Sequence, residues 1–112
     1  LYTVVAHKCI AIFDTASRTW ETTEAPHSPR SSAVSHYRGE IWVMGGRTKE
    51  GGKVSYIYNP GDGEWRKGPD LPCELVWGCA FNIAGELYLS GGAMPSPFRF
   101  SNRTFRFVGD VP

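Results

Sequence analysis

Residues 41–46 read Ile-Trp-Val-Met-Gly-Gly, and residues 87–92 repeat the pattern 46 positions later as Leu-Tyr-Leu-Ser-Gly-Gly. The same offset places Pro26 over Pro72. Each segment has the composition of a short β-strand that ends in a glycine turn. Self-similarity at a fixed period of 20 to 50 residues is the signature of a repeat architecture. The sequence therefore predicts repeated units of about 45 residues.

A second recurring pattern consists of two aromatic residues seven positions apart, followed by a proline. Its members are Phe13, Trp20 and Pro26, then Tyr58, Trp65 and Pro72, then Phe98, Phe105 and Pro112. Residues 1–6 also align with the two Gly-Gly segments, with Val5-Ala6 in place of the glycines. The chain is thus predicted to hold nearly three copies, of which the first lacks its opening strand.

The middle copy indicates the secondary structure. Four short strands are predicted, at residues 31–37, 40–45, 54–59 and 64–67. Arg38-Gly39 forms the turn between the first two strands, because glycine adopts the positive φ that a tight hairpin requires. No window of the sequence has a convincing helical period. Four-stranded antiparallel units of this length, which bury their faces by stacking side by side, are typical of β-propeller blades.

The predicted fold is therefore all-β, a propeller segment of nearly three four-stranded antiparallel blades. Its boundaries divide the chain into an incomplete first blade at 1–25, a second blade at 26–71 and a third blade at 72–112. The 112 residues suit one small domain, and the charged share of 21% is ordinary for a globular protein.

Charge and cysteine content exclude several classes of function. The formal net charge is +1 without a basic block, which argues against nucleic-acid binding. Apolar runs fall far short of the roughly 20 residues that span a bilayer. Cys9, Cys73 and Cys79 are odd in number and lack zinc-ligand spacing, so we expect no metal site and a reducing, cytoplasmic location.

The combination of these features resembles the kelch repeat, in which a Gly-Gly doublet closes an apolar strand and an aromatic residue, a tryptophan and a proline follow. The matching residues are Gly45-Gly46, Tyr58, Trp65 and Pro72, and then Gly91-Gly92, Phe98, Phe105 and Pro112. Val5-Ala6 and Phe105 depart from the pattern. The resemblance covers essentially the whole chain. It implies a kelch propeller segment whose glycines and tryptophans pack between blades.

Kelch propellers typically have five to seven blades, so nearly three blades require completion. The sequence leaves three alternatives open. The chain is a portion of a longer protein, or one half of a nicked propeller completed by a second chain, or a half that pairs with its own copy.

Enzyme signatures are scarce in this sequence. It contains no Gly-x-Ser-x-Gly, no phosphate-binding glycine loop and no His-Glu-x-x-His. His7, His27 and His36 have no carboxylate partner at a suggestive spacing. We therefore expect neither catalysis nor a cofactor. The alternative from another class is a kelch-like enzyme, either a copper oxidase or a sugar epimerase.

The resemblance implies that a partner docks on the end of the propeller built from loops, here residues 26–31, 47–53, 72–77 and 93–97. The candidate partner-binding residues on these loops are Arg30, Ser31, Arg47, Glu74 and Trp77. Arginine suits bidentate capture of a carboxylate or phosphate, and a loop tryptophan suits an anchoring role. The alternatives are that the arginines are solvated loop residues and that Trp77 packs between blades.

The implied function is protein binding at this loop end. The Tyr-Asn-Pro turn at residues 58–60 and the Gly-Pro-x-Leu-Pro stretch at residues 68–72 are most similar to the BTB-kelch proteins, which are substrate adaptors of cullin-RING ubiquitin ligases. The alternative among binding proteins is an actin or cytoskeletal scaffold.

Overall fold

The computed structural model describes residues 2–5, 9–26, 31–47, 51–95 and 98–109. Their strands are β1 (Tyr2–Val5), β2 (Cys9–Asp14), β3 (Thr19–Glu24), β4 (Ala33–Tyr37), β5 (Glu40–Met44), β6 (Ser55–Asn59), β7 (Glu64–Lys67), β8 (Cys79–Ile83), β9 (Glu86–Ser90), β10 (Ala93–Pro95), β11 (Phe98–Phe100) and β12 (Thr104–Arg106). This part of the chain contains no helix, and so none that could cross a membrane.

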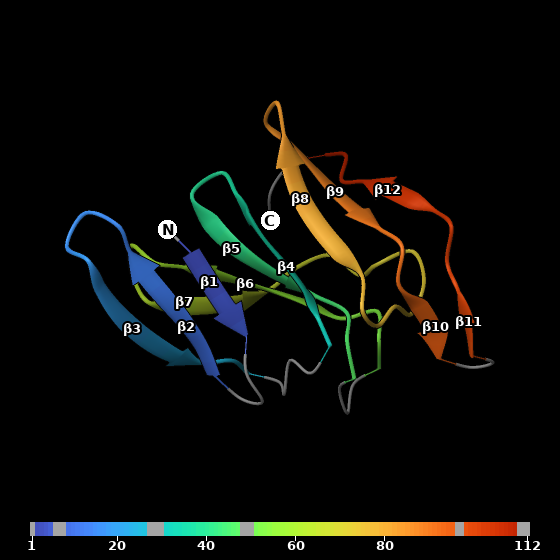
Figure 1. Ribbon diagram of the computed structural model, residues 1–112, viewed down its shortest axis with the longest axis horizontal. Coiled ribbons are helices and arrows are strands. Elements are labelled where there is room, and N and C mark those ends of the chain that lie inside the picture. The colour runs from blue at the N-terminus through green and yellow to red at the C-terminus, as the bar shows by residue number, and fades with distance from the viewer. Residues whose placement is uncertain (1, 6–8, 27–30, 48–50, 96–97, 110–112) are drawn as a thin grey trace.

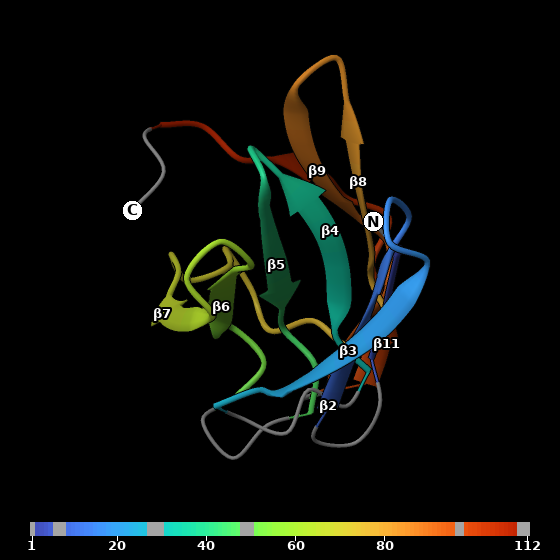
Figure 2. The same ribbon diagram turned by 90° about the vertical axis from the view of Figure 1, so that its left-hand side faces the viewer.

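The strands form three antiparallel sheets that lie side by side, with a separate hairpin at one end (Figure 1). The first sheet has the order β1-β2-β3, the second β4-β5-β6-β7 and the third β12-β9-β8, while β10 and β11 pair with each other. Seen from the side, the sheets are strongly twisted and fan out from one another (Figure 2). The prediction of an all-β segment of stacked antiparallel blades is confirmed.

The turn between the first two strands of a blade ends in a glycine and has two successive residues with positive φ. Arg38 and Gly39 have φ values of 51° and 78°, and Ala84 and Gly85 have values of 52° and 77°. Two successive positive φ angles match the right-handed twist of the flanking strands, which explains why this turn recurs. The turn predicted at Arg38-Gly39 is therefore present, and it is repeated one blade later.

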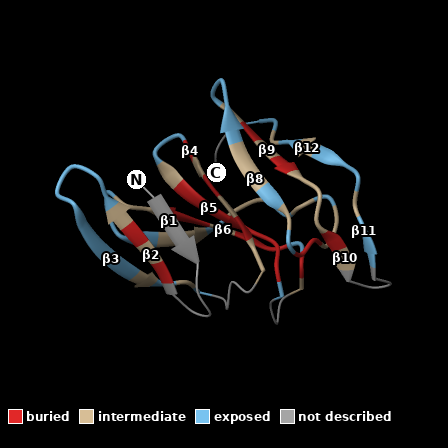
Figure 3. Cartoon of the chain, viewed as in Figure 1, coloured by how far each residue is buried: buried red, intermediate tan, exposed pale blue. Residues whose placement is uncertain are grey.

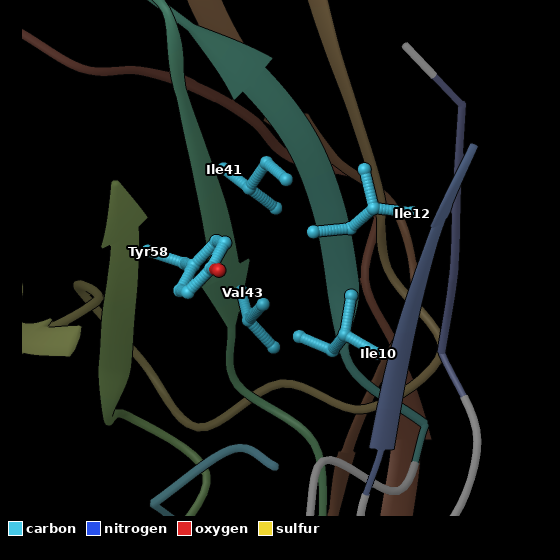
Figure 4. Close-up of a cluster of buried hydrophobic side chains, with 5 residues drawn as sticks. All are labelled: Ile10, Ile12, Ile41, Val43 and Tyr58. Carbon is cyan, nitrogen blue, oxygen red and sulfur yellow. The ribbon is translucent and has the colours of Figure 1, made fainter. Parts of the chain in front are cut away.

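The first buried cluster lies between the first and second blades. Ile10 and Ile12 of β2 point toward Ile41 and Val43 of β5 and toward Tyr58 of β6 (Figure 4). All five side chains are buried. Because successive residues of a strand point to opposite faces, Ile41 and Val43 share the face that looks toward the first blade.

The opposite face of the second blade packs against the third. Trp42, Met44 and Ile57 form a buried cluster there with Tyr37 and with Leu87 of β9. The second blade is therefore covered on both sides, and burial is concentrated in its strands (Figure 3). This arrangement explains why the middle strands are apolar at consecutive positions instead of alternating.

The first sheet has three strands in the described chain, and β1 takes the place of β5. Tyr2 pairs with Phe13 as Ile41 pairs with Tyr58. The alignment of β1 is shifted by one residue, because Tyr2 and not Leu1 corresponds to Ile41.

The third sheet departs from the prediction in its outer strand. Phe105 of β12 pairs with Leu89, and the Phe107 N–H donates to the Leu87 carbonyl oxygen at 2.9 Å. In the second blade Tyr58 lies opposite Ile41, the residue that matches Leu87. Phe107 therefore occupies the place of Tyr58, and the predicted match of Phe105 to Trp65 is wrong.

The cause of this error is an inserted hairpin. β10 and β11 lie between the second and third strands of the third blade, and Phe98 belongs to β11. The predicted match of Phe98 to Tyr58 is therefore wrong as well. Phe98 and Phe105 are seven residues apart, like Tyr58 and Trp65, but this equal spacing is a coincidence. The inserted hairpin shifts every later residue of the third blade relative to its equivalent in the second blade.

Candidate functional site

The candidate site lies where loops of successive blades meet at one end of the sheets (Figure 1). β4 begins and β5 ends at this end, and the segment from residue 68 to residue 78 reaches it between β7 and β8. The Gly46 N–H donates to the Leu75 carbonyl oxygen at 2.8 Å. This bond ties Gly46, which follows β5 of the second blade, to the entry of the third blade.

Arg47 and Trp77 come together at this end although 30 positions separate them. The Arg47 guanidinium carbon lies 5.2 Å from the centroid of the Trp77 ring. Both residues are exposed, and Trp77 retains 51% of its surface. A guanidinium stacked on an indole is held in one orientation by cation–π attraction while its N–H donors still face solvent. The pair is therefore a preformed cationic and aromatic surface.

Backbone geometry sets the orientation of Trp77. Trp77 has a φ of 58°, and Ser31, its equivalent 46 positions earlier, has a φ of 59°. The Trp77 N–H donates to the Ser31 carbonyl oxygen at 2.9 Å. Ser31 therefore serves through its backbone, by fixing the tryptophan at the entry of the next blade.

Glu74 lies against Gly51 and Gly52, which precede β6. It is half-buried, and its side chain packs against the loop glycines so closely that a Cβ at Gly51 would lie 3.3 Å from Glu74 Oε1. The Leu75 N–H donates to the Gly52 carbonyl oxygen at 3.2 Å in the same contact. Glu74 thus contacts the second blade. Arg30, the fifth predicted site residue, lies outside the described residues.

The β10–β11 hairpin extends this end of the molecule and was missed as a structural element. A bridge between Val76 and Ala93 joins it to the strand entry beside Trp77. Phe100, opposite Ala93, is 78% exposed, and Arg99 Nη2 lies 3.8 Å from Met94 Sδ. The alternation of aromatic residues at positions 98–100, after the Pro-Ser-Pro sequence, was the signal that could have revealed a strand.

The main ion pair of the structure lies away from these loops, next to the β4–β5 turn. The two terminal nitrogens of the Arg66 guanidinium donate to the Glu40 carboxylate, Nη1 to Oε2 and Nη2 to Oε1, the latter at 2.8 Å. This contact lowers the pKa of Glu40 and raises that of Arg66. Burial lowers the pKa of His36, on β4. No cluster of three His, Cys, Asp or Glu side chains suited to a metal ion occurs among the described residues.

The repeat residues themselves have packing roles. A Cβ at Gly45 would lie 2.6 Å from the Leu75 carbonyl oxygen, and Gly45 has a φ of 67°. Trp65 is half-buried, with its ring 5.1 Å from that of Tyr58 and its indole N–H donating to Thr23 of the first blade at 3.2 Å. These residues hold the blades together.

Similarity to known proteins identifies the repeat. The chain is 30% identical over 100 residues to Kelch domain-containing protein 3 of Rattus norvegicus and of Mus musculus, and the match covers 79% of the chain. The Homo sapiens protein of the same name is 29% identical over 98 residues. The repeat is the kelch repeat.

The kelch segment spans about a quarter (26%) of the length of the curated relatives that it matches. No family model matches the chain. The kelch assignment therefore rests on these relatives together with the Gly-Gly contacts and the stacked blades.

Proposed function

We propose that this kelch segment binds a partner protein through its loop end and does not catalyse a reaction. The observation that carries the proposal is the exposed Arg47–Trp77 pair, whose geometry is fixed by the Ser31–Trp77 backbone bond. A rigid aromatic ring loses little conformational freedom on binding, and a guanidinium can accept a planar anion in two bonds. The partner is accordingly a peptide or protein surface that presents a carboxylate or phosphate next to an apolar group.

The finer proposal concerns the assembly in which such binding would serve. The turn at residues 58–60 and the stretch at residues 68–72 resemble BTB-kelch substrate adaptors of cullin-RING ubiquitin ligases. We extend that role to the parent of this segment, acting in the cytoplasm, with the loop end as the surface that selects the substrate.

The experiment compares proteins captured by the immobilised chain and by matched variants. Arg47→Ala and Trp77→Ala should each weaken affinity for the same partner by about thirtyfold or more, because anchors of this kind contribute about 2 kcal/mol or more. Lys67→Ala is the control, because Lys67 is an exposed basic residue on the outer strand β7 and is none of the predicted site residues. Equal capture by all variants would refute the loop-end site.

The identity of the captured proteins separates the roles. Ubiquitin-ligase substrates, together with cullin recovery by the longer parent, would support the adaptor role. Co-sedimentation with filamentous actin would support a scaffold instead. Oxidase or epimerase turnover by the purified parent would overturn the non-catalytic proposal.

A further inference from the structure

The β10–β11 hairpin is an addition to the repeat. In the second blade β5 and β6 are paired neighbours with no strand between them in the described chain, whereas both strands of the hairpin separate β9 from β12 in the third blade. The hairpin lies at the loop end, beyond the ends of the sheet strands (Figure 1). Its residues are therefore not explained by the packing of one blade on the next.

Backbone bonds fix the hairpin beside the Arg47–Trp77 pair. The Val76 N–H donates to the Ala93 carbonyl oxygen at 2.9 Å, and the Ala93 N–H donates to the Val76 carbonyl oxygen at 2.8 Å. Val76 directly precedes Trp77 in the chain. The hairpin and the Arg47–Trp77 pair are therefore parts of one continuous surface.

Arg99 lies on the side of the hairpin that looks toward the second blade. It is the cross-strand partner of Met94, so the two side chains share one face, and Arg99 Nη2 lies 3.8 Å from Met94 Sδ. Met94 packs on the buried cluster of Ala33, Leu75 and Leu89, where the second and third blades meet. The Arg99 guanidinium thus lies over the same junction of blades as the Arg47–Trp77 pair.

The positive charges of this surface are not neutralised within the described chain. Arg47 and Arg99 are exposed and form no ion pair there, because one guanidinium lies on an indole and the other on a thioether. The Glu74 carboxylate, on the neighbouring loop, lies against Gly51. Residues 87–109 contain three arginines and no Asp, Glu or Lys. A surface with this balance of charge attracts anions.

We propose that the hairpin and the Arg47–Trp77 pair together bind an extended peptide that carries an anionic side chain on each side of an apolar residue. Arg47 binds the first anion, Trp77 contacts the apolar residue and Arg99 binds the second anion. Each guanidinium can bind a carboxylate or a phosphate through two parallel N–H donors. The inference rests on the proposed function and adds to it a second charged contact, from an element outside the repeat.

An array of immobilised nonapeptides tests the proposal with the full 112-residue chain. Each peptide has a central leucine or tryptophan, and every other position carries glutamate, phosphoserine, serine or lysine in turn. We expect the chain to select an anionic residue at one position on each side of the central residue. Stronger retention by the glutamate peptides would identify an acidic segment as the partner, and stronger retention by the phosphoserine peptides would identify a phosphorylated one.

Matched protein variants assign each selected position to one arginine. Arg99→Ala should remove the selection at one position and weaken binding of the best peptide by about tenfold. Arg99→Lys retains the charge and should retain the preference for an anion, whereas Arg99→Glu should reverse it in favour of lysine. Arg47→Ala should remove the selection at the other position. Arg18→Ala is the control, because Arg18 is exposed on the turn between β2 and β3, at the opposite end of the sheets (Figure 1).

The outcomes separate this inference from the proposed function. If Arg47→Ala and Trp77→Ala remove the selection and Arg99→Ala leaves it unchanged, the two-anion inference is wrong and the loop-end site stands. An equal loss in Arg18→Ala would indicate unspecific attraction of charge and would also overturn the inference. So would the absence of any preference for anionic peptides. The proposed function fails as well only if Arg47→Ala and Trp77→Ala leave the capture of partner proteins unchanged.

Discussion

At the residue scale, Gly45 of the Gly-Gly doublet is required by sterics as well as by its backbone conformation. Gly45 has a positive φ, and any Cβ there would meet the Leu75 carbonyl oxygen at 2.6 Å. Gly39 also has a positive φ, but nothing lies within 4 Å of its Cβ position. We therefore expect Gly45→Ala to lower the free energy of unfolding by about 2–4 kcal/mol.

Gly39→Ala is the control, because it incurs only the backbone cost of about 1–2 kcal/mol. Urea denaturation of both variants measures the difference. Similar losses for the two variants would mean that the Leu75 carbonyl moves aside at little cost.

Trp77 provides a second prediction at the residue scale. A substitution there can remove the indole side chain and still allow the backbone to keep its positive φ. Its φ of 58° costs a non-glycine residue about 1–2 kcal/mol, which glycine avoids. Trp77→Gly should therefore leave the free energy of unfolding within about 1 kcal/mol of the unmodified chain and still weaken partner binding. A large loss of stability instead would show that the indole packs between the blades, the alternative that the sequence left open.

At the element scale, the β4–β5 hairpin and the outer strand β7 are joined by the Glu40–Arg66 ion pair. The pKa of Glu40 is lowered from its ordinary value of 4.5 by this contact, so its carboxylate stabilises the fold fully above about pH 4.5. The contribution is lost as the pH falls through the lowered pKa. Because Arg66 is 35% exposed and screened by solvent, we expect Glu40→Gln to cost only about 1 kcal/mol at pH 7.

The difference between Glu40→Gln and the unmodified chain should shrink toward zero as the pH falls below 4.5, as measured by urea denaturation at several pH values. Glu86→Gln is the matched control, because Glu86 follows the equivalent turn of the third blade and forms no ion pair within the described chain. A constant difference across the acid range would show that Glu40 contributes through packing and not through its charge.

The strands of the second blade could be predicted almost to the residue, because turns with glycine and apolar runs delimit each one. The third blade could not be predicted as well. β10 and β11 are an insertion. The spacing alone assigned Phe105 to the position of Trp65, whereas Phe105 pairs with Leu89. The register of a sheet depends on which strands pair with each other. A local spacing pattern cannot show that pairing when the connection between two strands contains additional strands.

At the scale of the whole molecule, the loop end of the propeller followed from the repeat, but the contacts within it did not. Arg47 and Trp77 were both predicted site residues, yet their stacking depends on how closely two blades approach and on the positive φ of Trp77. No local sequence pattern specifies the distance between the two blades or the φ of Trp77. The sequence could name these residues only as candidates, and the stacking of the blades determines which of them meet.

The same stacking makes two equivalent tryptophans unequal, which gives a prediction for the molecule as a whole. Trp65 is half-buried against the first blade and bonds Thr23, whereas Trp20, its equivalent, is 59% exposed and rests on Phe13 with ring centroids 5.1 Å apart. Trp65→Ala should lower the free energy of unfolding of the 112-residue chain by about 3 kcal/mol, and Trp20→Ala by about 1 kcal/mol or less. Urea denaturation at several protein concentrations measures both. A different outcome is that both substitutions lower the free energy of unfolding equally, by an amount that increases with protein concentration. That result would mean that a second copy of the chain covers Trp20, as the first blade covers Trp65.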